Sequence, residues 1–362
     1  MVKEYYLSIL SGQQRGFIAA IVKSTLSAFT LPYLAVLSTR NALYRSDIVK
    51  STRLPVKVIS VGNITTGGTG KTPHVAFILE NLNAKNKAVI SRGYGRKSNK
   101  LIEGNTQIHT SKDLGDEPLE ILRKFEGDNF KMIVEGNRIK ALKYLEQHKN
   151  KTDIVILDDG FQHRYAQRDL NILLTDYNKP FFEDEIIPLG TLRESKGNAN
   201  RADVILVTKC PNNISEKIQN DFSSQISNYC TAKTFFTTIE YRGLINSNDE
   251  LEQIDNTKKY LLITGIANPQ PIYEYLAENK IHFAAKKYSD HHSFSKKEIQ
   301  YIIKKSENCD AIITTEKDWM RLKETNLAEA ISIEVLRLSI GIKFVDSEQD
   351  NTFNKLTKSL ID

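Results

Sequence analysis

One glycine-rich segment has the residue types and spacing of a triphosphate site. Residues 66–72 read Thr-Gly-Gly-Thr-Gly-Lys-Thr and follow an apolar run at 58–61, which predicts a turn from a buried strand into a helix beginning near Lys71. Backbone N–H groups in such a turn can converge on one anion, and the helix N-terminus adds partial positive charge. Lys71 can reach terminal phosphates, and the Thr72 hydroxyl can ligate Mg²⁺. The residues expected to hold a nucleoside triphosphate are therefore Thr66, Gly67, Gly68, Thr69, Gly70, Lys71 and Thr72.

The segment departs from the usual phosphate-loop pattern at one position. Thr65 stands where the first glycine is expected. An ordinary glycine-rich loop is the alternative interpretation. The preceding strand and the following helix favour a phosphate site, and Pro73 suits the first helical turn, where its missing N–H costs little.

Two pairs of carboxylates are candidates for metal binding and proton transfer. Asp158 and Asp159 end the apolar run 154–157, and ligands bind at that edge of an open α/β sheet. Carboxylates there can hold the Mg²⁺ of a bound triphosphate. Asp116 and Glu117 begin a predicted helix, where they could serve as a base and a metal ligand. Asp116 could equally be only a helix N-cap.

Arginines and histidines extend this set. Guanidinium groups suit phosphate because they donate two parallel hydrogen bonds and stay charged. Any one of these arginines could be a surface ion pair, but three glycine-containing loops carry them, at 92–96, Arg138 and Arg193. His291 and His292 lie next to each other in a polar loop. One imidazole could act as a proton acceptor, or both could simply be exposed.

The elements that position these residues alternate between apolar runs and amphipathic segments. This alternation predicts an α/β fold, with a parallel sheet covered by helices on both faces. We expect a helical segment over residues 1–50, a core like that of P-loop NTPases over 51–245, and a smaller α/β domain over 246–362. With 362 residues, 40% hydrophobic and 26% charged, the chain is long enough for two globular domains. Its three cysteines show no metal or disulfide spacing and are expected to be buried thiols.

The amino-terminal segment is both basic and apolar. Residues 1–57 carry the whole formal net charge of +6, and the remainder is balanced. Residues 17–37 are long enough for a membrane span, but polar residues fall on one helical side and Pro32 interrupts the run. A helix in the membrane interface is favoured; a true span and a helix packed on the protein's own core are alternatives. A cleaved secretory signal is disfavoured, and nucleic acid is not an expected partner because the basic residues cluster with aliphatic ones.

Together these motifs resemble a known family. The chain is similar to tetraacyldisaccharide 4′-kinase, the lipid A kinase of Gram-negative bacteria, from about residue 10 to residue 325. The matching blocks, in order, are residues 62–63, 66–73, 91–96, 115–118, 158–163, 189–194, 265–269, 290–292 and 314–318. The glycine loop without its first glycine is also that family's form.

The resemblance implies an activity, a location and residue roles. It implies transfer of the ATP γ-phosphate to the 4′-hydroxyl of a tetraacylated glucosamine disaccharide 1-phosphate. The enzyme would lie at the cytoplasmic face of the inner membrane as a peripheral or monotopic protein, with no obligate protein partner evident. Asp116 would be the base, paired with His291 from the other domain. The remaining roles would be phosphate contact or charge stabilisation for Lys71, Arg138 and Arg193, and metal binding for Thr72, Glu117, Asp158 and Asp159.

Other functions fit parts of the sequence. A membrane-associated regulatory or assembly P-loop ATPase would hydrolyse ATP without a lipid acceptor, and a non-catalytic membrane module would use nucleotide only as a switch. A GTPase would carry an aspartate after Thr208-Lys209-Cys210, where Pro211 stands.

Overall fold

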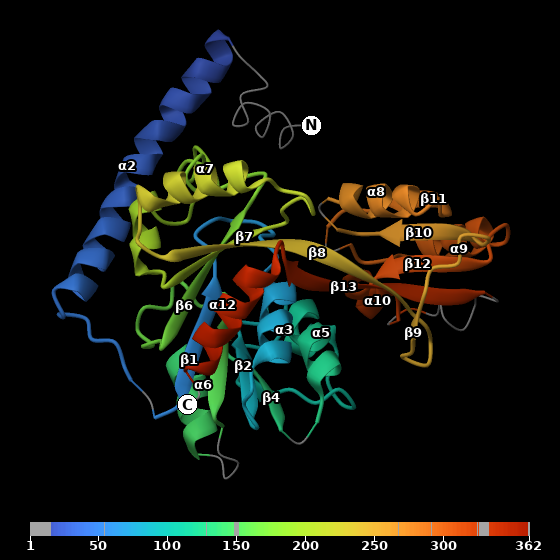
Figure 1. Ribbon diagram of the computed structural model, residues 1–362, viewed down its shortest axis with the longest axis horizontal. Coiled ribbons are helices and arrows are strands. Elements are labelled where there is room, and N and C mark those ends of the chain that lie inside the picture. The colour runs from blue at the N-terminus through green and yellow to red at the C-terminus, as the bar shows by residue number, and fades with distance from the viewer. Residues whose placement is uncertain are drawn as a thin grey trace. The chain divides into compact units, whose positions relative to one another are not determined.

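The chain forms two compact units, each assembled from separated segments (Figure 1). The computed structural model describes residues 16–53, 55–127, 129–147, 152–266, 268–290, 292–323, 325 and 333–360. Unit 1 takes its described residues from Met1–Arg92, Asn137–Thr238 and Phe344–Asp362. Unit 2 takes its described residues from Gly93–Gly136 and Ile239–Lys343.

Unit 1 contains the parallel sheet that the sequence predicts. Its strands run in the order β2-β5-β1-β6-β7-β8, and every printed pairing among them is parallel. Strands buried on both faces form continuous apolar runs, as β5 and β7 do. The strand bounds are β1 Lys57–Gly62, β2 Lys87–Ser91, β5 Ile154–Asp158, β6 Leu170–Asp176, β7 Val204–Thr208 and β8 Lys233–Ile245, the last extending by its second half into unit 2. The α/β expectation for the core is confirmed.

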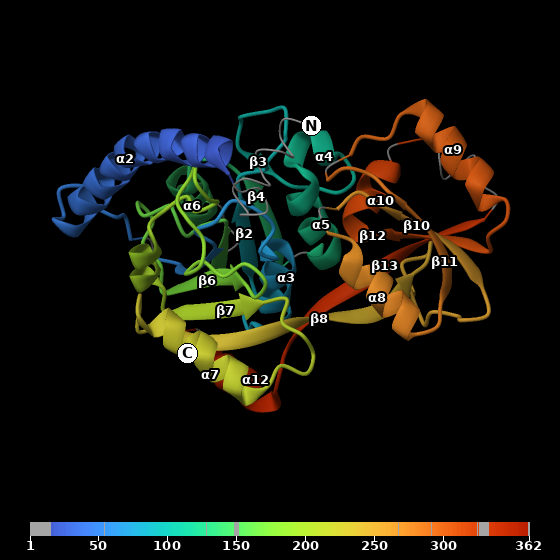
Figure 2. The ribbon, with the colours of Figure 1, turned by 90° about the horizontal axis from the view of Figure 1, so that it is seen from above.

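The helices of unit 1 begin with a long apolar one. Helix α2 lies along the outer side of the unit in two views (Figures 1 and 2), and by length and composition it could cross a membrane. Helix α3 follows β1 and packs on β1 and β5. The bounds are α2 Phe17–Arg45, α3 Lys71–Asn81, α6 Arg138–Gln147, the 3₁₀ helix η1 Lys196–Arg201, α7 Glu216–Ser227 and α12 Ser347–Lys358.

The carboxy-terminal helix α12 packs against the helix that follows the glycine loop. The Phe353 ring lies 6.5 Å from the Phe77 ring of α3 and 5.7 Å from the Phe235 ring of β8. Phe344 completes this aromatic cluster, with its ring 5.5 Å from that of Phe77. The tail of the chain, for which the sequence offered no motif, therefore supports α3 from behind.

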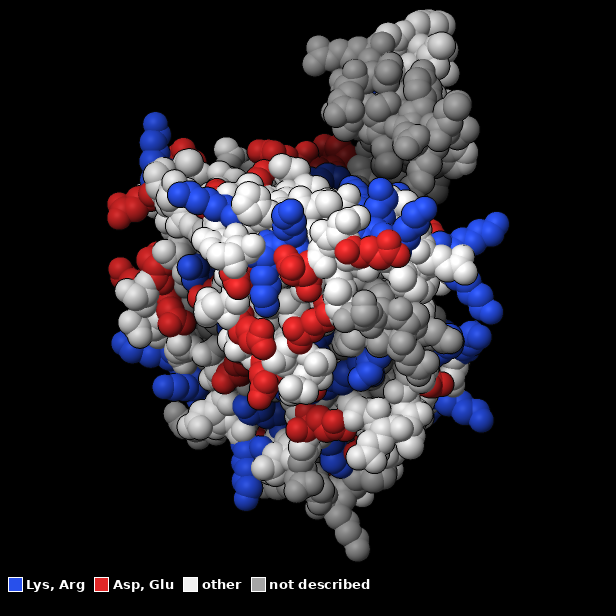
Figure 3. Space-filling view, turned by 90° about the vertical axis from the view of Figure 1, so that its right-hand side faces the viewer, with Lys and Arg blue, Asp and Glu red and all other residues white. Residues whose placement is uncertain are grey.

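Unit 2 is a second, smaller α/β unit. Four parallel strands run in the order β11-β10-β12-β13, and β3 pairs antiparallel with β4. Acidic and basic side chains are interspersed over the face that Figure 3 shows. The bounds are β3 Ile102–Glu103, α4 Ser111–Leu114, α5 Asp116–Phe125, β4 Phe130–Val134, β9 Leu251–Glu252, β10 Lys259–Thr264, α8 Gln270–Glu278, β11 His282–Lys287, α9 Lys296–Ser306, β12 Ala311–Thr315, α10 Glu316–Leu322 and β13 Glu334–Phe344.

The division into units does not follow the contiguous boundaries expected at residues 51, 245 and 246. Segment 93–136, expected within the core, clusters with residues 239–343, because α5 packs on α10. Segment 344–362, expected in the second domain, belongs to unit 1 through the aromatic cluster of Phe353. A division made along the sequence misses both, since each contact joins residues that are far apart in the chain.

We predict that Phe353→Ala destabilises unit 1 by roughly 3–5 kcal/mol, because it empties a fully buried aromatic site behind α3. The measurement is urea unfolding of the full chain followed by circular dichroism. Lys355→Ala, an exposed position of the same helix, is the control and should change stability by less than about 0.5 kcal/mol. Equal effects of the two substitutions would contradict the packing role of α12.

Candidate active site

The glycine loop joins β1 to α3 as the sequence predicts. Strand β1 ends at Gly62, and α3 begins at Lys71. Gly70 occupies the N-cap position with a φ of 81°, a left-handed conformation that glycine adopts without steric cost. The N–H of His74 donates to the Gly70 carbonyl at 3.2 Å, so the helix starts directly behind Lys71. The N–H groups of the first helical turn are thereby directed at the loop.

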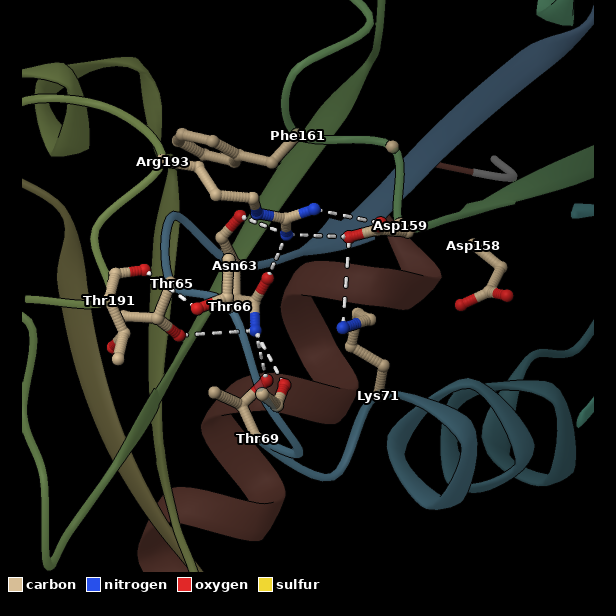
Figure 4. A network of polar contacts seen from close by, with 12 residues as sticks. Asn63, Thr65, Thr66, Thr69, Lys71, Asp158, Asp159, Phe161, Thr191 and Arg193 are labelled. Atoms are coloured by element: carbon tan, nitrogen blue, oxygen red, sulfur yellow. Dashed lines mark hydrogen bonds and ion pairs between the residues drawn. The ribbon is translucent and has the colours of Figure 1, made fainter. Parts of the chain in front are cut away.

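A buried asparagine organises the loop from inside (Figure 4). The Asn63 side-chain amide donates to the Thr69 hydroxyl at 2.8 Å, to the Thr65 hydroxyl at 3.3 Å and to the Gly67 carbonyl at 3.4 Å. One side chain therefore ties the start, the middle and the end of the loop together. The sequence analysis assigned no role to Asn63, although it stands in the first of the family blocks.

The first part of the loop is paired with a second segment, which explains the missing glycine. The Thr66 N–H donates to the Thr191 carbonyl at 2.7 Å, and the Arg193 N–H donates to the Ile64 carbonyl at 2.7 Å. Thr65 forms a β-bridge with Leu192 between these two bonds. Thr65 lies outside the positive-φ residues of the described chain, so an L side chain fits there.

Strand β5 brings the two adjacent aspartates beside the loop. A Cβ on Gly62 would lie 2.8 Å from the Phe161 backbone nitrogen, so only glycine allows the segment after β5 to pass this close to β1. The Ser91 hydroxyl donates to the Asp158 carboxylate at 2.8 Å. The buried Arg138 side chain donates to the Asp158 carbonyl at 2.9 Å.

Asp159 lies between two cations (Figure 4). Arg193 donates to its two carboxylate oxygens at 3.1 and 3.2 Å, and Lys71 Nζ lies 3.8 Å from Oδ1. Burial opposes ionisation of Asp159, but the hydrogen bonds from Arg193 and the charges of Lys71, Arg193 and Arg138 outweigh it and lower the pKa of the carboxyl. Arg193 also donates to the Asn63 carbonyl at 3.2 Å and to its side-chain oxygen. Three of the predicted residues, Lys71, Asp159 and Arg193, therefore meet at this point.

Two residues that the sequence analysis did not assign hold the loop from the side of β7. Lys209 Nζ donates to the Gly68 carbonyl at 2.5 Å and to Asp176 at 2.6 Å. The Thr208 hydroxyl donates to the Thr69 carbonyl at 3.0 Å. The sequence analysis considered this Thr-Lys pair only as an incomplete guanine-reading motif.

His74 supports the loop from within α3. It is buried, with Nδ1 lying 2.7 Å from the Gly70 carbonyl and Nε2 lying 2.9 Å from the Thr237 hydroxyl. Burial lowers the pKa of His74 to about 4, partly opposed by the bond to Gly70. The ring is therefore neutral at physiological pH and braces the N-cap of α3 against β8.

Asp116 belongs to unit 2 and is more than a helix cap. Gly115 occupies the N-cap position of α5, and Asp116 is the first helical residue. Arg321 Nε donates to the Asp116 carboxylate at 3.0 Å, and Arg321 Nη1 donates to the buried Asp318 at 3.3 Å. Asp318 in turn accepts from the Gly265 N–H at 2.7 Å. Two family blocks that carried no assigned role, at 265–269 and 314–318, thus support Asp116.

Glu117 and His292 are the other described candidate residues of unit 2. Glu117 lies near Glu120, whose pKa is raised to about 8 by burial and by the charges of Glu316 and Glu117. His291 lies outside the described residues. His292 Nε2 contacts Glu298 at 2.9 Å, and His292 Nδ1 lies 3.3 Å from the Ser289 hydroxyl. Asp116 and the described residues on either side of His291 belong to the same unit, whereas the sequence analysis expected them in different domains.

Comparison with known proteins decides which family carries this arrangement. The protein-family model of Tetraacyldisaccharide-1-P 4′-kinase matches residues 22–360. The chain belongs to this family. The Tetraacyldisaccharide 4′-kinase of Flavobacterium psychrophilum is 39% identical over 91% of this chain and 94% of its own length, and that of Cytophaga hutchinsonii is 37% identical over 94% and 97%. A crystal structure of LpxK from Aquifex aeolicus in complex with ATP covers 94% of this chain and 100% of its own, at 26% identity and a TM-score of 0.74.

The tetraacyldisaccharide 4′-kinase family implies a divalent cation, and the chemistry of the donor set in unit 1 fits Mg²⁺. Thr72, Asp158 and Asp159 offer only oxygen atoms, which hard cations prefer. Among the described residues, no cluster of three or more His, Cys, Asp or Glu side chains could hold a metal ion. Mg²⁺ is usually held by one or two carboxylates together with substrate phosphates.

We predict that His74→Gln makes folding less sensitive to acid. The folded-state pKa of His74, about 4, lies below its ordinary value of 6.5. The unfolded chain therefore takes up this proton first as pH falls from about 6.5 toward 4, and stability is lost over that window. Between pH 7 and 5 the unfolding free energy of the wild type should fall more steeply than that of the variant, by up to about 1.4 kcal/mol per pH unit. Parallel curves for the two proteins from urea titrations would contradict the assignment.

Proposed function

We propose that the protein transfers the γ-phosphate of ATP to the 4′-hydroxyl of a tetraacylated glucosamine disaccharide 1-phosphate, a step of lipid A biosynthesis. The family match over residues 22–360 supports this activity, as do the names of the relatives. The observation that carries it is the loop that ends at Gly70, with Lys71 beginning α3 and lying 3.8 Å from Asp159. The relative solved in complex with ATP supports ATP as the phosphate donor.

The residues of unit 1 have separate tasks in this proposal. The loop amides and Lys71 bind the β- and γ-phosphates, because they supply converging donors and one cation. Arg193 stabilises charge on the transferring phosphoryl group, since its guanidinium already holds one carboxylate in a bidentate contact. Arg138, fully buried beneath Asp158, positions that carboxylate and the phosphate donor.

Mg²⁺ is part of the proposal through Thr72, Asp158 and Asp159, with Glu117 as a further candidate ligand. When bound, the cation neutralises charge on the phosphate oxygens. The Ser91 hydroxyl orients Asp158 for this task through the 2.8 Å hydrogen bond. Asp159 has to release Lys71 or Arg193 when the phosphates arrive, since both cations then have a stronger anionic partner.

Asp116 is the proposed base for the acceptor hydroxyl, with His291 as its proposed partner. A carboxylate can take the proton late in a transfer that depends mainly on positioning and charge stabilisation. Arg321 orients the Asp116 carboxylate through the 3.0 Å bond from its Nε. Both ring nitrogens of His292 have partners in Glu298 and Ser289, which supports the choice of His291.

We place the protein at the cytoplasmic face of the inner membrane, where ATP and a lipid acceptor are both available. Helix α2 supports membrane association, since its apolar stretch is mostly unburied and carries six exposed large side chains, Phe17, Ile18, Ile21, Phe29, Leu31 and Val36. The acylated disaccharide and the lipid surface are the proposed partners, and no nucleic-acid or obligate protein partner is part of the proposal.

The proposed activity is tested with γ-labelled ATP and a purified acylated disaccharide 1-phosphate in detergent micelles. We expect the label in a lipid-extractable product, in amounts equal to the ADP formed. Label released only as inorganic phosphate would instead identify a regulatory or assembly ATPase. No turnover with full ATP binding would identify a nucleotide-switched module.

Asp116→Ala should lower turnover in this assay by a factor on the order of 10² or more, because the attacking hydroxyl loses its proton acceptor. Binding of ATP should persist, measured by calorimetric titration. The matched control is Asp113→Ala, which removes a carboxylate three residues earlier in the capping box of α4 and should leave turnover within about twofold. Equal turnover in the two variants would remove Asp116 from the mechanism.

Loss of exposed apolar area on α2 should release the protein from lipid. Leu31 and Val36 are each 69% exposed, and the double substitution Leu31→Ser, Val36→Ser should sharply reduce co-sedimentation with anionic phospholipid vesicles. Ile108→Ser with Leu251→Ser removes apolar side chains of similar exposure from unit 2 and is the control. Equal sedimentation of both double variants and the wild type would show that α2 is not the membrane contact.

A further inference from the structure

Helix α2 presents a second face to the protein, and this face is not explained by membrane contact. One stripe of the helix recurs at spacings of three and four residues and faces unit 1. Thr30, Leu37 and Asn41 on this stripe are buried. Tyr33 and Leu34 pack on the core cluster that contains Ile64, Phe161 and Leu192. These three cluster residues adjoin the glycine loop, the aspartate pair and Arg193, so the helix is packed on the back of the nucleotide site.

Three polar contacts of this stripe reach one short segment, residues 193–198, and Asn41 also accepts from Arg164 at 2.9 Å. The Tyr33 hydroxyl donates to the Arg193 carbonyl at 2.9 Å. Arg40 Nη2 donates to Glu194 Oε1 at 2.7 Å. The Asn41 amide donates to the Asn198 side-chain oxygen at 3.3 Å. A helix that only anchored the protein in lipid would not need three hydrogen bonds to residues 193, 194 and 198.

The Arg40–Glu194 contact joins α2 to a buried carboxylate directly beside Arg193. The Glu194 side chain is 1% exposed, and Arg201 holds its second carboxylate oxygen. Arg201 in turn lies over the Phe161 ring at 4.5 Å. Loss of Arg40 would leave the buried Glu194 carboxylate with one of its two arginine contacts, so Arg40 helps to fix the segment around Glu194.

Arg193 itself is held from both sides. Its N–H donates to the Ile64 carbonyl and its carbonyl accepts from Tyr33, so the backbone of Arg193 is pinned between the glycine loop and α2. Its side chain then reaches Asp159 and Asn63. An unbroken series of contacts therefore leads from α2 through Arg193 and Asn63 to Thr69 in the phosphate loop.

We propose that Tyr33 and Arg40 are positioning residues that hold Arg193 in the phosphate site, so that the helix facing the lipid also supports phosphoryl transfer. The inference rests on the proposed function, because it takes Arg193 to act on the transferring group. It predicts that α2 contributes to kcat even when the lipid acceptor is presented in detergent and membrane recruitment is no longer needed.

The test is steady-state kinetics of the full chain with γ-labelled ATP and the acylated disaccharide in detergent micelles. Tyr33→Phe keeps the ring and removes one hydrogen bond, and we expect kcat to fall about 5- to 10-fold with both KM values within about twofold. Arg40→Met should give a similar or larger loss, and Arg40→Lys should recover part of it by restoring the charge beside Glu194. The melting temperature of Tyr33→Phe should stay close to that of the wild type.

Two further measurements distinguish the effect of α2 on Arg193 from its contact with the lipid surface. The Leu31→Ser, Val36→Ser variant should keep wild-type kcat in micelles, since it alters only the face turned away from unit 1. In an Arg193→Ala background, Tyr33→Phe should cause no further loss, because its effect passes through Arg193.

A kcat within twofold of wild type for both Tyr33→Phe and Arg40→Met would overturn the inference. So would the same fold loss from Tyr33→Phe with and without Arg193. If Arg40→Met does not fold, Tyr33→Phe alone decides. Failure of the wild type to label lipid would refute the proposed function, whereas an active wild type with unaffected variants refutes only this inference.

Discussion

The pairing of residues 64–66 with residues 191–193 is the constraint on which the rest of the site depends. Two backbone hydrogen bonds of 2.7 Å flank the bridge between Thr65 and Leu192 and fix the path of the loop before its glycines begin. The same pairing sets the position of Arg193, which then reaches Asp159 and Asn63. Without it, the loop amides, the acidic edge of β5 and the arginine would each have to be ordered separately. Fixing the backbone of each segment costs conformational entropy, and this one pairing fixes both segments together.

This arrangement brings the cations of the candidate phosphate site together before any anion is bound. Lys71 and Arg193 share one carboxylate, and Asn63 links that arginine to the loop. Preorganised groups of this kind need little rearrangement when charge develops on a transferring phosphoryl group. The proposed base, Asp116, is organised separately in unit 2, where Asp318 holds Gly265 and Arg321, and Arg321 holds Asp116. The two family blocks that the sequence left without a role, at 265–269 and 314–318, therefore have a physical reason.

The sequence predicts the parts of this site whose signals are local. The start of α3 at Lys71 follows from glycines before an amphipathic run, and Asp158 at the end of β5 follows from an apolar run that stops at an acid. The contacts that the sequence does not reveal join distant residues. Arg193 and Asn63 are 130 positions apart, and Lys209 and Gly68 are 141 apart. The two-segment composition of unit 2 is hidden for the same reason, since nothing in residues 93–136 signals that α5 packs on α10.

The most direct measurement is a crystal structure of the full chain with adenylyl imidodiphosphate and Mg²⁺. We predict that the β- and γ-phosphates lie against the backbone N–H groups of residues 67–72 and Lys71, with the pairing of residues 64–66 and 191–193 intact. Arg193 should then have turned at least part of its guanidinium from Asp159 toward the γ-phosphate. A nucleotide bound elsewhere, or an empty loop under conditions that support turnover, would contradict the account.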